Sequence, residues 1–435
     1  MAETVDQSAQ SIRISTHLRR RKMSTQNALF TPVKIGKRTA ANRFVINAME
    51  CCDSDKEGNP TEPTYERYTN LFNGQAGLID LEAITVTYEN RGRDSQLGIM
   101  PRNEPALTKF VSALRKVNDK PLFIFQLTHA GELSHPAFSK RVCVKPLPGF
   151  GGELLSEEDI ERIQDEFVQA AKISYHAGAD GVDLKFCHGY LGSQILRPYN
   201  DRKWKYGGSW ENRSRFAFEL TERVVREIND PNFLIGSKVS VWEGFPGGCG
   251  SAGPDSSVMD LTESIALAKG LEERGAAYIL QSAGSPSITL ALSQPDKKIP
   301  DYAYLHHTFS KILRDNLKPE TIVIGSAYTI FRDGKNALQA VDREKNTLLY
   351  WGDKNIRDGV VDMVALGRQS LADPFTPVKL MEGREEDVKW CTADDHCIEL
   401  LIRQKNVGCC TFNKPYVEAL QAVRREEGLL KEKRT

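Results

Sequence analysis

Residues 181–190 read Gly-Val-Asp-Leu-Lys-Phe-Cys-His-Gly-Tyr, a short strand-like run that ends in polar residues. Alternation along a strand places Val182, Leu184 and Phe186 on one face and Gly181, Asp183 and Lys185 on the other. In a closed barrel the second face points inward, where a lysine and an aspartate are costly unless they are paired or used in chemistry. The stretch therefore predicts a barrel strand with His188 and Tyr190 at its carboxyl end.

Seven further apolar runs along the chain have the length of strands, and helical patterns separate them. The eight runs cover residues 44–47, 77–81, 122–127, 181–185, 235–241, 277–281, 321–324 and 363–366. One helical pattern contains Ile160, Ile163 and Phe167, with a start signal at Ser156 and a stop signal at Gly178. Eight strands that alternate with helices predict an α/β fold closed into a (β/α)8 TIM barrel. A doubly wound open sheet is the alternative.

Composition excludes several classes of protein. The 435 residues carry 58 Lys and Arg against 58 Asp and Glu, so there is no basic excess for binding nucleic acid. No apolar run approaches the roughly 18 residues that a membrane helix needs. Nine cysteines in a chain of this length do not indicate a secreted disulfide scaffold, and a reduced, cytoplasmic location is expected.

Three regions are expected. Residues 1–24, polar and basic, are predicted to be a disordered leader, with a transit peptide as the alternative. Residues 25–385 are predicted to form the barrel. Residues 386–435 are predicted to form a short cysteine-containing extension with a charged helix from about Pro415.

The residues after the strand at 181 suggest a chemistry. In a TIM barrel the segments that follow the strands form the active face, so Lys185, His188 and Tyr190 are expected to converge there. Two such donors can stabilise an enolate oxygen, and a phenol can protonate the adjacent carbon. A structural Lys–Asp pair beside a satisfied histidine is the alternative interpretation.

A long motif identifies a family. Residues 188–216 read HGYLGSQILRPYNDRKWKYGGSWENRSRF, which resembles the signature of the Old Yellow Enzyme family. Residues 29–45, the Gln126–Gly131 stretch and Ala365-Leu366-Gly367-Arg368 are similar to other parts of the family pattern. The resemblance covers residues 29–380. It implies a (β/α)8 barrel that binds FMN, with ene-reductases and NADH oxidases as the related activities.

The resemblance assigns roles to the three residues after the strand. Tyr190 matches the proton donor of the family, and His188 matches the second residue of the pair that binds the substrate carbonyl or carboxyl. Lys185 stands where a His or Asn is usual. Because a full cation holds an anionic oxygen more strongly than a neutral imidazole does, Lys185 favours carboxylate, thioester or phenolate-like substrates.

The resemblance also implies the cofactor-binding residues. These are Ala48, Met49, Glu50 and Ala83 beside the flavin, Gln126 at its pyrimidine edge, Lys238 near N1, and Gly325, Ser326, Gly367 and Arg368 at the phosphate. Ordinary turn chemistry is the alternative explanation of the glycines. Glu50 is a departure, because the family usually has Thr or Cys there. It is expected near the reactive edge of the flavin, as a protonated group, a substrate contact or an acid–base group, with an outward-turned surface glutamate as the alternative.

The C-terminal cysteines form a second departure. Larger family members bind a [4Fe–4S] cluster with three closely spaced cysteines and a fourth further on. Here the corresponding residues are Cys391, Asp394, Cys397 and Cys409. Because clusters normally use four thiolates, the resemblance leaves open a cluster with an oxygen ligand, His396 or Cys410 as a substitute, a zinc ion, or a lost site.

These observations predict an FMN-dependent oxidoreductase that transfers hydride from reduced flavin to an electron-poor alkene, such as an enone, enoate or enoyl thioester. NAD(P)H is expected as the reductant. Flavin-dependent amine or alcohol dehydrogenation and a non-catalytic flavin-binding scaffold are the alternatives. A small-molecule substrate and a homo-oligomer are expected, an electron-transfer partner is a candidate, and neither nucleic acid nor membrane is expected as a partner.

Overall fold

The computed structural model describes residues 27–296, 298–334 and 342–429, and the predicted leader lies outside them. Eight parallel strands close into a barrel in the order β10-β11-β12-β3-β4-β5-β8-β9, with β9 pairing to β10. They are β3 (Phe44–Ile46), β4 (Leu78–Thr85), β5 (Leu122–Thr128), β8 (Gly181–Phe186), β9 (Leu234–Ser240), β10 (Tyr278–Ser282), β11 (Ile322–Gly325) and β12 (Met363–Leu366). All eight predicted strands are confirmed, and the open-sheet alternative is excluded.

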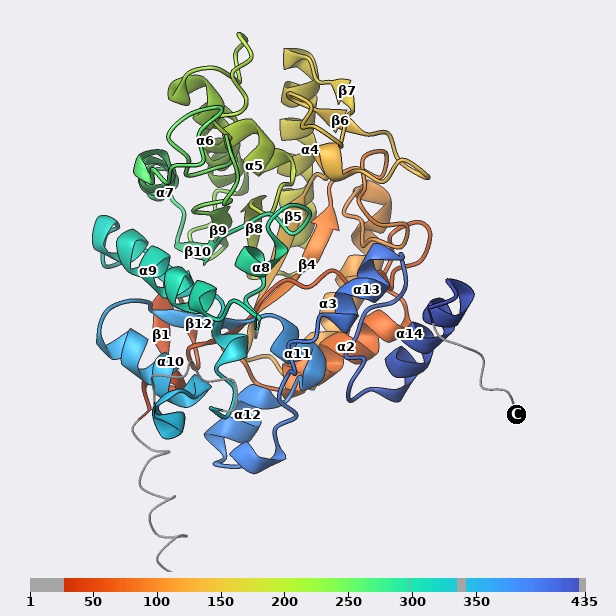
Figure 1. The fold of residues 1–435 in the computed structure, drawn as a ribbon, viewed down its shortest axis with the longest axis vertical. Helices are drawn as coiled ribbons and strands as arrows, with labels where there is room; N and C mark the ends of the chain where they lie inside the picture. Colours follow the sequence, from red (N-terminus) through yellow and green to blue (C-terminus); the bar gives the residue numbers. More distant parts are fainter. Residues whose placement is uncertain (1–26, 297, 335–341, 430–435) are drawn as a thin grey trace, which may run out of the picture.

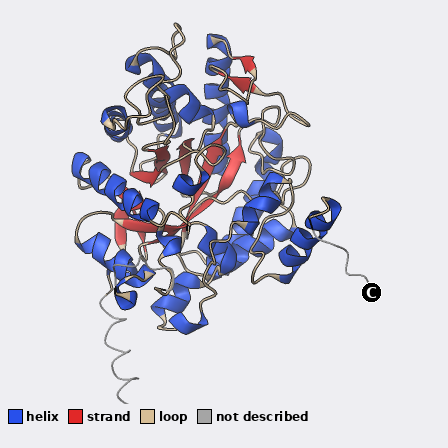
Figure 2. Ribbon diagram, viewed as in Figure 1, coloured by secondary structure: helices blue, strands red, loops and turns tan. Residues whose placement is uncertain are grey.

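Helices surround the strands, as Figures 1 and 2 show. The helices that follow the first seven barrel strands are α2 (Glu62–Asn73), α3 (Glu104–Val117), α4 (Glu157–His176), α6 (Trp210–Ile228), α7 (Thr262–Glu273), α9 (Asp301–Asn316) and α10 (Leu348–Arg357). After β12 come α11 (Arg368–Ala372) and α12 (Thr376–Met381). The start predicted at Ser156 is confirmed, because its hydroxyl caps α4 at the Asp159 amide, 3.1 Å away.

The remaining elements occupy the loops and the two ends of the described chain. They are β1 (Val33–Ile35), β2 (Arg38–Ala40), β6 (Val142–Cys143), β7 (Glu153–Leu154), α5 (Leu191–Leu196), α8 (Leu290–Ser293), α13 (His396–Ile402) and α14 (Lys414–Glu426), with 3-10 turns η1 (Ala28–Phe30), η2 (Pro101–Asn103), η3 (Gly131–Leu133), η4 (Tyr328–Ile330), η5 (Arg343–Lys345) and η6 (Glu385–Asp387). Within the described residues, no helix is both long and apolar enough to cross a membrane.

Two apolar layers stabilise the barrel. Outward-facing strand residues such as Val182 and Leu184 pack against the helices in one large core. A second core fills the barrel interior and includes Val45 and Leu280, with Ile35 from the β1–β2 hairpin. The interior near the carboxyl ends of the strands is polar instead, so the fold directs its reactive side chains to that end.

Candidate active site

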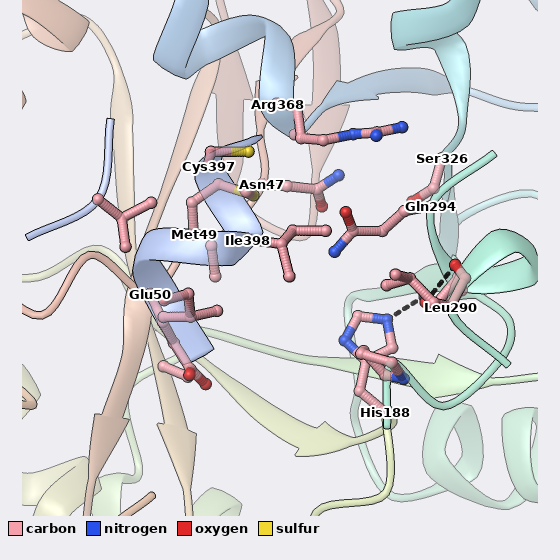
Figure 3. A pocket seen from close by; sticks show the side chains of 18 of the residues that line it. Asn47, Met49, Glu50, His188, Leu290, Gln294, Ser326, Arg368, Cys397 and Ile398 are labelled. Carbon is pink, nitrogen blue, oxygen red and sulfur yellow. Dashed lines mark hydrogen bonds between the residues drawn. The ribbon is translucent and has the colours of Figure 1, made fainter. Parts of the chain in front are cut away.

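A cavity of about 300 Å³ opens at the carboxyl ends of the strands (Figure 3). Of the predicted catalytic and flavin-binding residues, it is lined by Ala48, Met49, Glu50, Ala83, Gln126, Lys185, His188, Tyr190, Lys238, Ser326, Gly367 and Arg368. Gly325 does not line it. A Cβ at Gly325 would lie 2.5 Å from Cγ1 of Val361, so this glycine permits close packing behind β11.

Glu50 holds the centre of a charged cluster at one side of the cavity. It follows β3, and its side chain is only 9% exposed, which excludes the outward-turned orientation. Its carboxylate lies 3.2 Å from Nζ of Lys185 and 2.8 Å from Nε of Arg93, and it accepts a hydrogen bond from the Tyr190 hydroxyl. Burial alone would raise the pKa of Glu50, but the two cations and the phenol lower it to about 2.

Lys185 and Tyr190 are held together within this cluster. Nζ of Lys185 lies 3.3 Å from the centroid of the Tyr190 ring, a cation–π contact. Burial and the neighbouring charge of Glu50 raise the pKa of Tyr190 well above its usual value, so the phenol keeps its proton. Lys185 makes its ion pair with Glu50 rather than with Asp183, which corrects the structural Lys–Asp pair considered from the sequence.

Arg93 is a site residue that the sequence did not reveal. It lies in the loop between β4 and α3, forty-three positions after Glu50, and no motif marks it. Burial lowers its pKa, but the charge of Glu50 outweighs this and raises the pKa above its ordinary value. The cavity therefore combines two cations with one carboxylate at this side.

His188 lies away from Glu50 across the cavity in Figure 3. Its backbone takes a left-handed conformation (φ 62°), and its amide donates to Oγ of Ser240 at 3.1 Å. One ring nitrogen lies 2.7 Å from Oγ of Ser282. Burial and the charges of Lys238 and Lys185 lower the pKa of His188 well below its usual value, so the imidazole is neutral.

The donors expected around a flavin are present and buried. Nε2 of Gln126 donates to carboxylate oxygens of Asp80 and Asp183, each at 3.3 Å. Lys238 Nζ lies 3.2 Å from Oδ1 of Asn47, and burial lowers its pKa. In the part of the chain that the structure describes, the buried Ser326 hydroxyl has no hydrogen-bond partner. An orphaned donor beside a polar cavity fits a missing hydrogen-bonding group, as bound FMN would provide.

Arg368 is engaged by the C-terminal extension. Its guanidinium pairs with Asp395 and donates to the Pro295 carbonyl oxygen at 2.7 Å. Asp395 immediately precedes α13 and has a left-handed backbone (φ 61°). The arginine predicted at the phosphate thus also ties the extension to the start of α11.

The four C-terminal residues do not fit a metal site. Across residues 27–296, 298–334 and 342–429, no group of three or more His, Cys, Asp or Glu side chains is arranged to hold a metal ion. Asp394 instead accepts hydrogen bonds from the hydroxyls of Thr392 and Thr411, at 2.6 and 2.9 Å. Cys391 and Cys409 pack with Ala372, whereas Cys397 lines the cavity, and burial raises its pKa to about 12. The Asp394 carboxylate is therefore already engaged by two threonine hydroxyls, and the three cysteines are divided between a packed interior and the cavity wall.

Comparison with protein families and curated proteins gives a consistent result. Residues 28–387 match the model of the NADH:flavin oxidoreductase / NADH oxidase family. The chain is 28% identical to an NADH oxidase of Thermoanaerobacter brockii over 88% of its own length, but it spans only 56% of that protein. It is 29% identical to an NADPH dehydrogenase of Bacillus subtilis (80% of this chain, 92% of the relative). It is 25% identical to an N,N-dimethylglycine/sarcosine dehydrogenase of Chromohalobacter salexigens (88% and 52%).

Solved structures show the same fold at low identity. A complex of 2-naphthoyl-CoA reductase with 2-naphthoyl-CoA superimposes with a TM-score of 0.73 at 21% identity, covering 88% of this chain and 56% of that chain. Histamine dehydrogenase from Rhizobium sp. 4-9 gives a TM-score of 0.68 at 23% identity, covering 88% and 52%.

Proposed function

Because the chain belongs to the NADH:flavin oxidoreductase / NADH oxidase family, also called the Old Yellow Enzyme family, we propose that it is an FMN-dependent oxidoreductase that reduces an electron-poor alkene. NAD(P)H is the proposed reductant. The overall reaction converts the alkene, NAD(P)H and a proton into the saturated product and NAD(P)⁺. The substrate is an α,β-unsaturated carbonyl compound whose activating oxygen gains negative charge.

The net positive charge around Glu50 is the observation that supports alkene reduction. Lys185 and Arg93 contribute two positive charges against the single carboxylate of Glu50. The excess positive charge favours a carboxylate, or an oxygen that becomes an enolate in the transition state. Because these groups are buried, their interaction with such an oxygen is screened less than it would be in water.

The chain's own residues provide the remaining steps. Bound FMN, when reduced, supplies a hydride for the β-carbon of the alkene. Lys185 and His188 polarise the activating group, and the Tyr190 hydroxyl gives its proton to the α-carbon. Glu50 stays ionised and positions both Lys185 and the Tyr190 phenol. The hydroxyl proton leaves its hydrogen bond to Glu50 as it passes to the α-carbon, and water then returns a proton to the phenolate.

Amine dehydrogenation is the second candidate, because a carboxylate lines the cavity and a sarcosine dehydrogenase is among the relatives. A free carboxylate would attract a substrate ammonium group. Glu50, however, is already neutralised by two cations, so a cationic amine would meet net positive charge. Alkene reduction is therefore the better-supported function.

The test uses the FMN-loaded enzyme under anaerobic conditions. Mixing with NADH or NADPH is expected to bleach the flavin absorbance, and cyclohex-2-enone or 3-phenylprop-2-enoate is expected to restore it. N,N-Dimethylglycine is expected to leave oxidised flavin unchanged. Bleaching by the amine would support the second candidate instead, and no bleaching by any reductant would indicate a scaffold without turnover.

Substitution of Glu50 by Gln tests the proposed role of the two cations. Removing one negative charge beside Lys185 and Arg93 should tighten the binding of 3-phenylprop-2-enoate to oxidised enzyme by about tenfold, equivalent to about 1.4 kcal/mol. The affinity for neutral cyclohex-2-enone should change little. Kd is measured from the perturbation of the flavin spectrum, with the exposed Glu57→Gln as the charge-matched control. Weaker binding of the enoate would contradict the proposed role of the cations.

A further inference from the structure

The C-terminal extension forms part of the cavity wall. Cys397, Ile398, Leu401 and Ile402 of α13 all line the cavity, and Val407 lines it just beyond the helix. These positions lie on one face of the helix, because residues four apart are neighbours there. The segment for which the resemblance left a metal site open contributes an apolar surface to the cavity.

This wall is fixed in position relative to the charged cluster. Leu400 is fully buried and packs with Cys51 and Leu371. The Val407 amide donates a hydrogen bond to the carbonyl oxygen of Cys51 at 2.9 Å, and Cys51 directly follows Glu50 in the chain. The Asp94 amide, next to Arg93, donates to Oε1 of Gln404 at 3.1 Å. The extension thus holds both segments that carry the polar half of the site.

The cavity has two chemically different parts. In Figure 3, Ile398 projects into the space between Met49 and Gln294, away from the carboxylate of Glu50. Ile402 lines the cavity although 65% of its surface is exposed, which places it at the opening. A ligand whose charged group meets Lys185 therefore extends towards an aliphatic surface.

We propose that α13 is the specificity element of the enzyme, with Ile398, Leu401 and Ile402 receiving the apolar body of the substrate. The substrate is then a 2-enoate, or a related unsaturated carbonyl compound, that bears an aromatic or branched hydrocarbon group. This inference rests on the proposed alkene reduction. It deepens that function, because it assigns selectivity to a segment outside the barrel.

The proposal is tested with two ligands that share the enoate group and differ in their apolar part. These are but-2-enoate and 3-phenylprop-2-enoate, and Kd for each is measured on oxidised FMN-loaded enzyme from the flavin spectrum. Wild type should bind the phenyl compound at least tenfold more tightly. Ile398→Ala should reduce this preference about tenfold, because contacts with the phenyl ring are lost, while the Kd of but-2-enoate stays within about twofold.

Ile398→Phe provides a second variant, since it fills the space that the phenyl group would occupy. It should weaken the binding of 3-phenylprop-2-enoate at least tenfold and leave the Kd of but-2-enoate within about twofold. Leu429→Ala, an exposed aliphatic change in the same extension, is the matched control. Thermal melting and FMN content confirm that each variant is folded.

Two results would overturn the inference. One is equal binding of the two ligands by wild type, and the other is a change that affects both ligands equally in the Ile398 variants. Turnover separates this failure from that of the proposed function. If no alkene reoxidises the reduced enzyme, alkene reduction is wrong, while the ratio of the two Kd values still decides whether α13 selects the apolar group.

Discussion

The carboxylate of Glu50 pairs with the side chains of Lys185 and Arg93 and accepts a hydrogen bond from the Tyr190 hydroxyl. The charge state and position of each group therefore depend on the others. Without Glu50, the two cations would repel each other in a buried space. Without the cations, burial would raise the pKa of Glu50 and favour its protonated form. The two cations therefore keep Glu50 ionised, and Glu50 offsets the repulsion between them and holds the Tyr190 phenol in place.

Tyr190→Phe tests whether Tyr190 donates the proton to the α-carbon. The substitution should slow reoxidation of reduced enzyme by an enoate by roughly two to four orders of magnitude, because a general acid is lost. Reduction of the flavin by NAD(P)H should keep its rate, since no carbon is protonated in that half-reaction. Stopped-flow absorbance measures both steps separately.

The pH profile gives an independent control on Tyr190. Because the pKa of Tyr190 lies well above its usual value, the reoxidation rate in wild type should not fall between about pH 7 and pH 10 through loss of this proton. Equal slowing of both half-reactions in Tyr190→Phe would mean that the phenol positions the flavin or the ligand instead.

Strand β4 and helix α2 share a buried ion cluster next to the segment that follows Glu50. Arg67 of α2 contacts both Glu82 of β4 and Asp53, each at 2.6 Å. Glu82 also accepts a hydrogen bond from the Cys51 amide at 2.8 Å. The single positive charge of Arg67 thus pairs with two carboxylates, and it cannot neutralise both negative charges.

The pKa of Glu82 predicts how stability depends on pH. Burial raises this pKa most, Asp53 raises it further, and Arg67 only partly opposes them, which leaves it at about 7. The folded state therefore binds more protons than the unfolded state between about pH 4.5 and pH 7, so this contribution to stability is lost as the pH rises through that range. The loss is on the order of 3 kcal/mol at most, given about 1.4 kcal/mol per pKa unit.

Glu82→Gln checks this pH dependence. The variant cannot ionise, so the decrease in its melting temperature between pH 4.5 and pH 7 should be smaller than in wild type. Glu57→Gln, an exposed change of the same kind, should follow wild type. Parallel curves for Glu82→Gln and wild type would show that Glu82 does not titrate in this range.

The two ends of the barrel differ in what they contribute, one to the site and the other to stability. The cavity lies at the carboxyl ends of the strands, whereas Ile35 of the β1–β2 hairpin is fully buried in the barrel-interior core with Leu78 and Leu234. In TIM barrels the amino-terminal end contributes stability and the opposite end contributes chemistry.

Ile35→Ala should therefore destabilise the fold without changing the site. The expected loss is about 2–5 kcal/mol in the free energy of unfolding, because a cavity replaces a buried side chain. The affinity for FMN and the Kd of enoates should remain those of wild type at temperatures where the variant is folded. A changed ligand Kd would show that the two ends are coupled.

Periodicity in the sequence was sufficient to predict the eight strands, the helix that Ser156 caps and the inward direction of Lys185. These features depend on local geometry, since residues two apart share a strand face and residues three or four apart share a helix face. The motif at residues 188–216 was specific enough to indicate the family, and most predicted flavin residues do line one cavity.

Which distant segments meet could be seen only once the chain was folded. Arg93 reaches Glu50 because the β4–α3 loop is folded over the cavity, and Asp395 reaches Arg368 because the extension packs against α11. The C-terminal cysteines have a spacing similar to that of an iron–sulfur site, but Asp394 accepts hydrogen bonds from Thr392 and Thr411. Helix α13 turns its apolar face to the cavity. Sequence spacing determines what a short segment can form by itself. The partners of each side chain depend on how loops far apart in the chain pack together, and no local pattern encodes that.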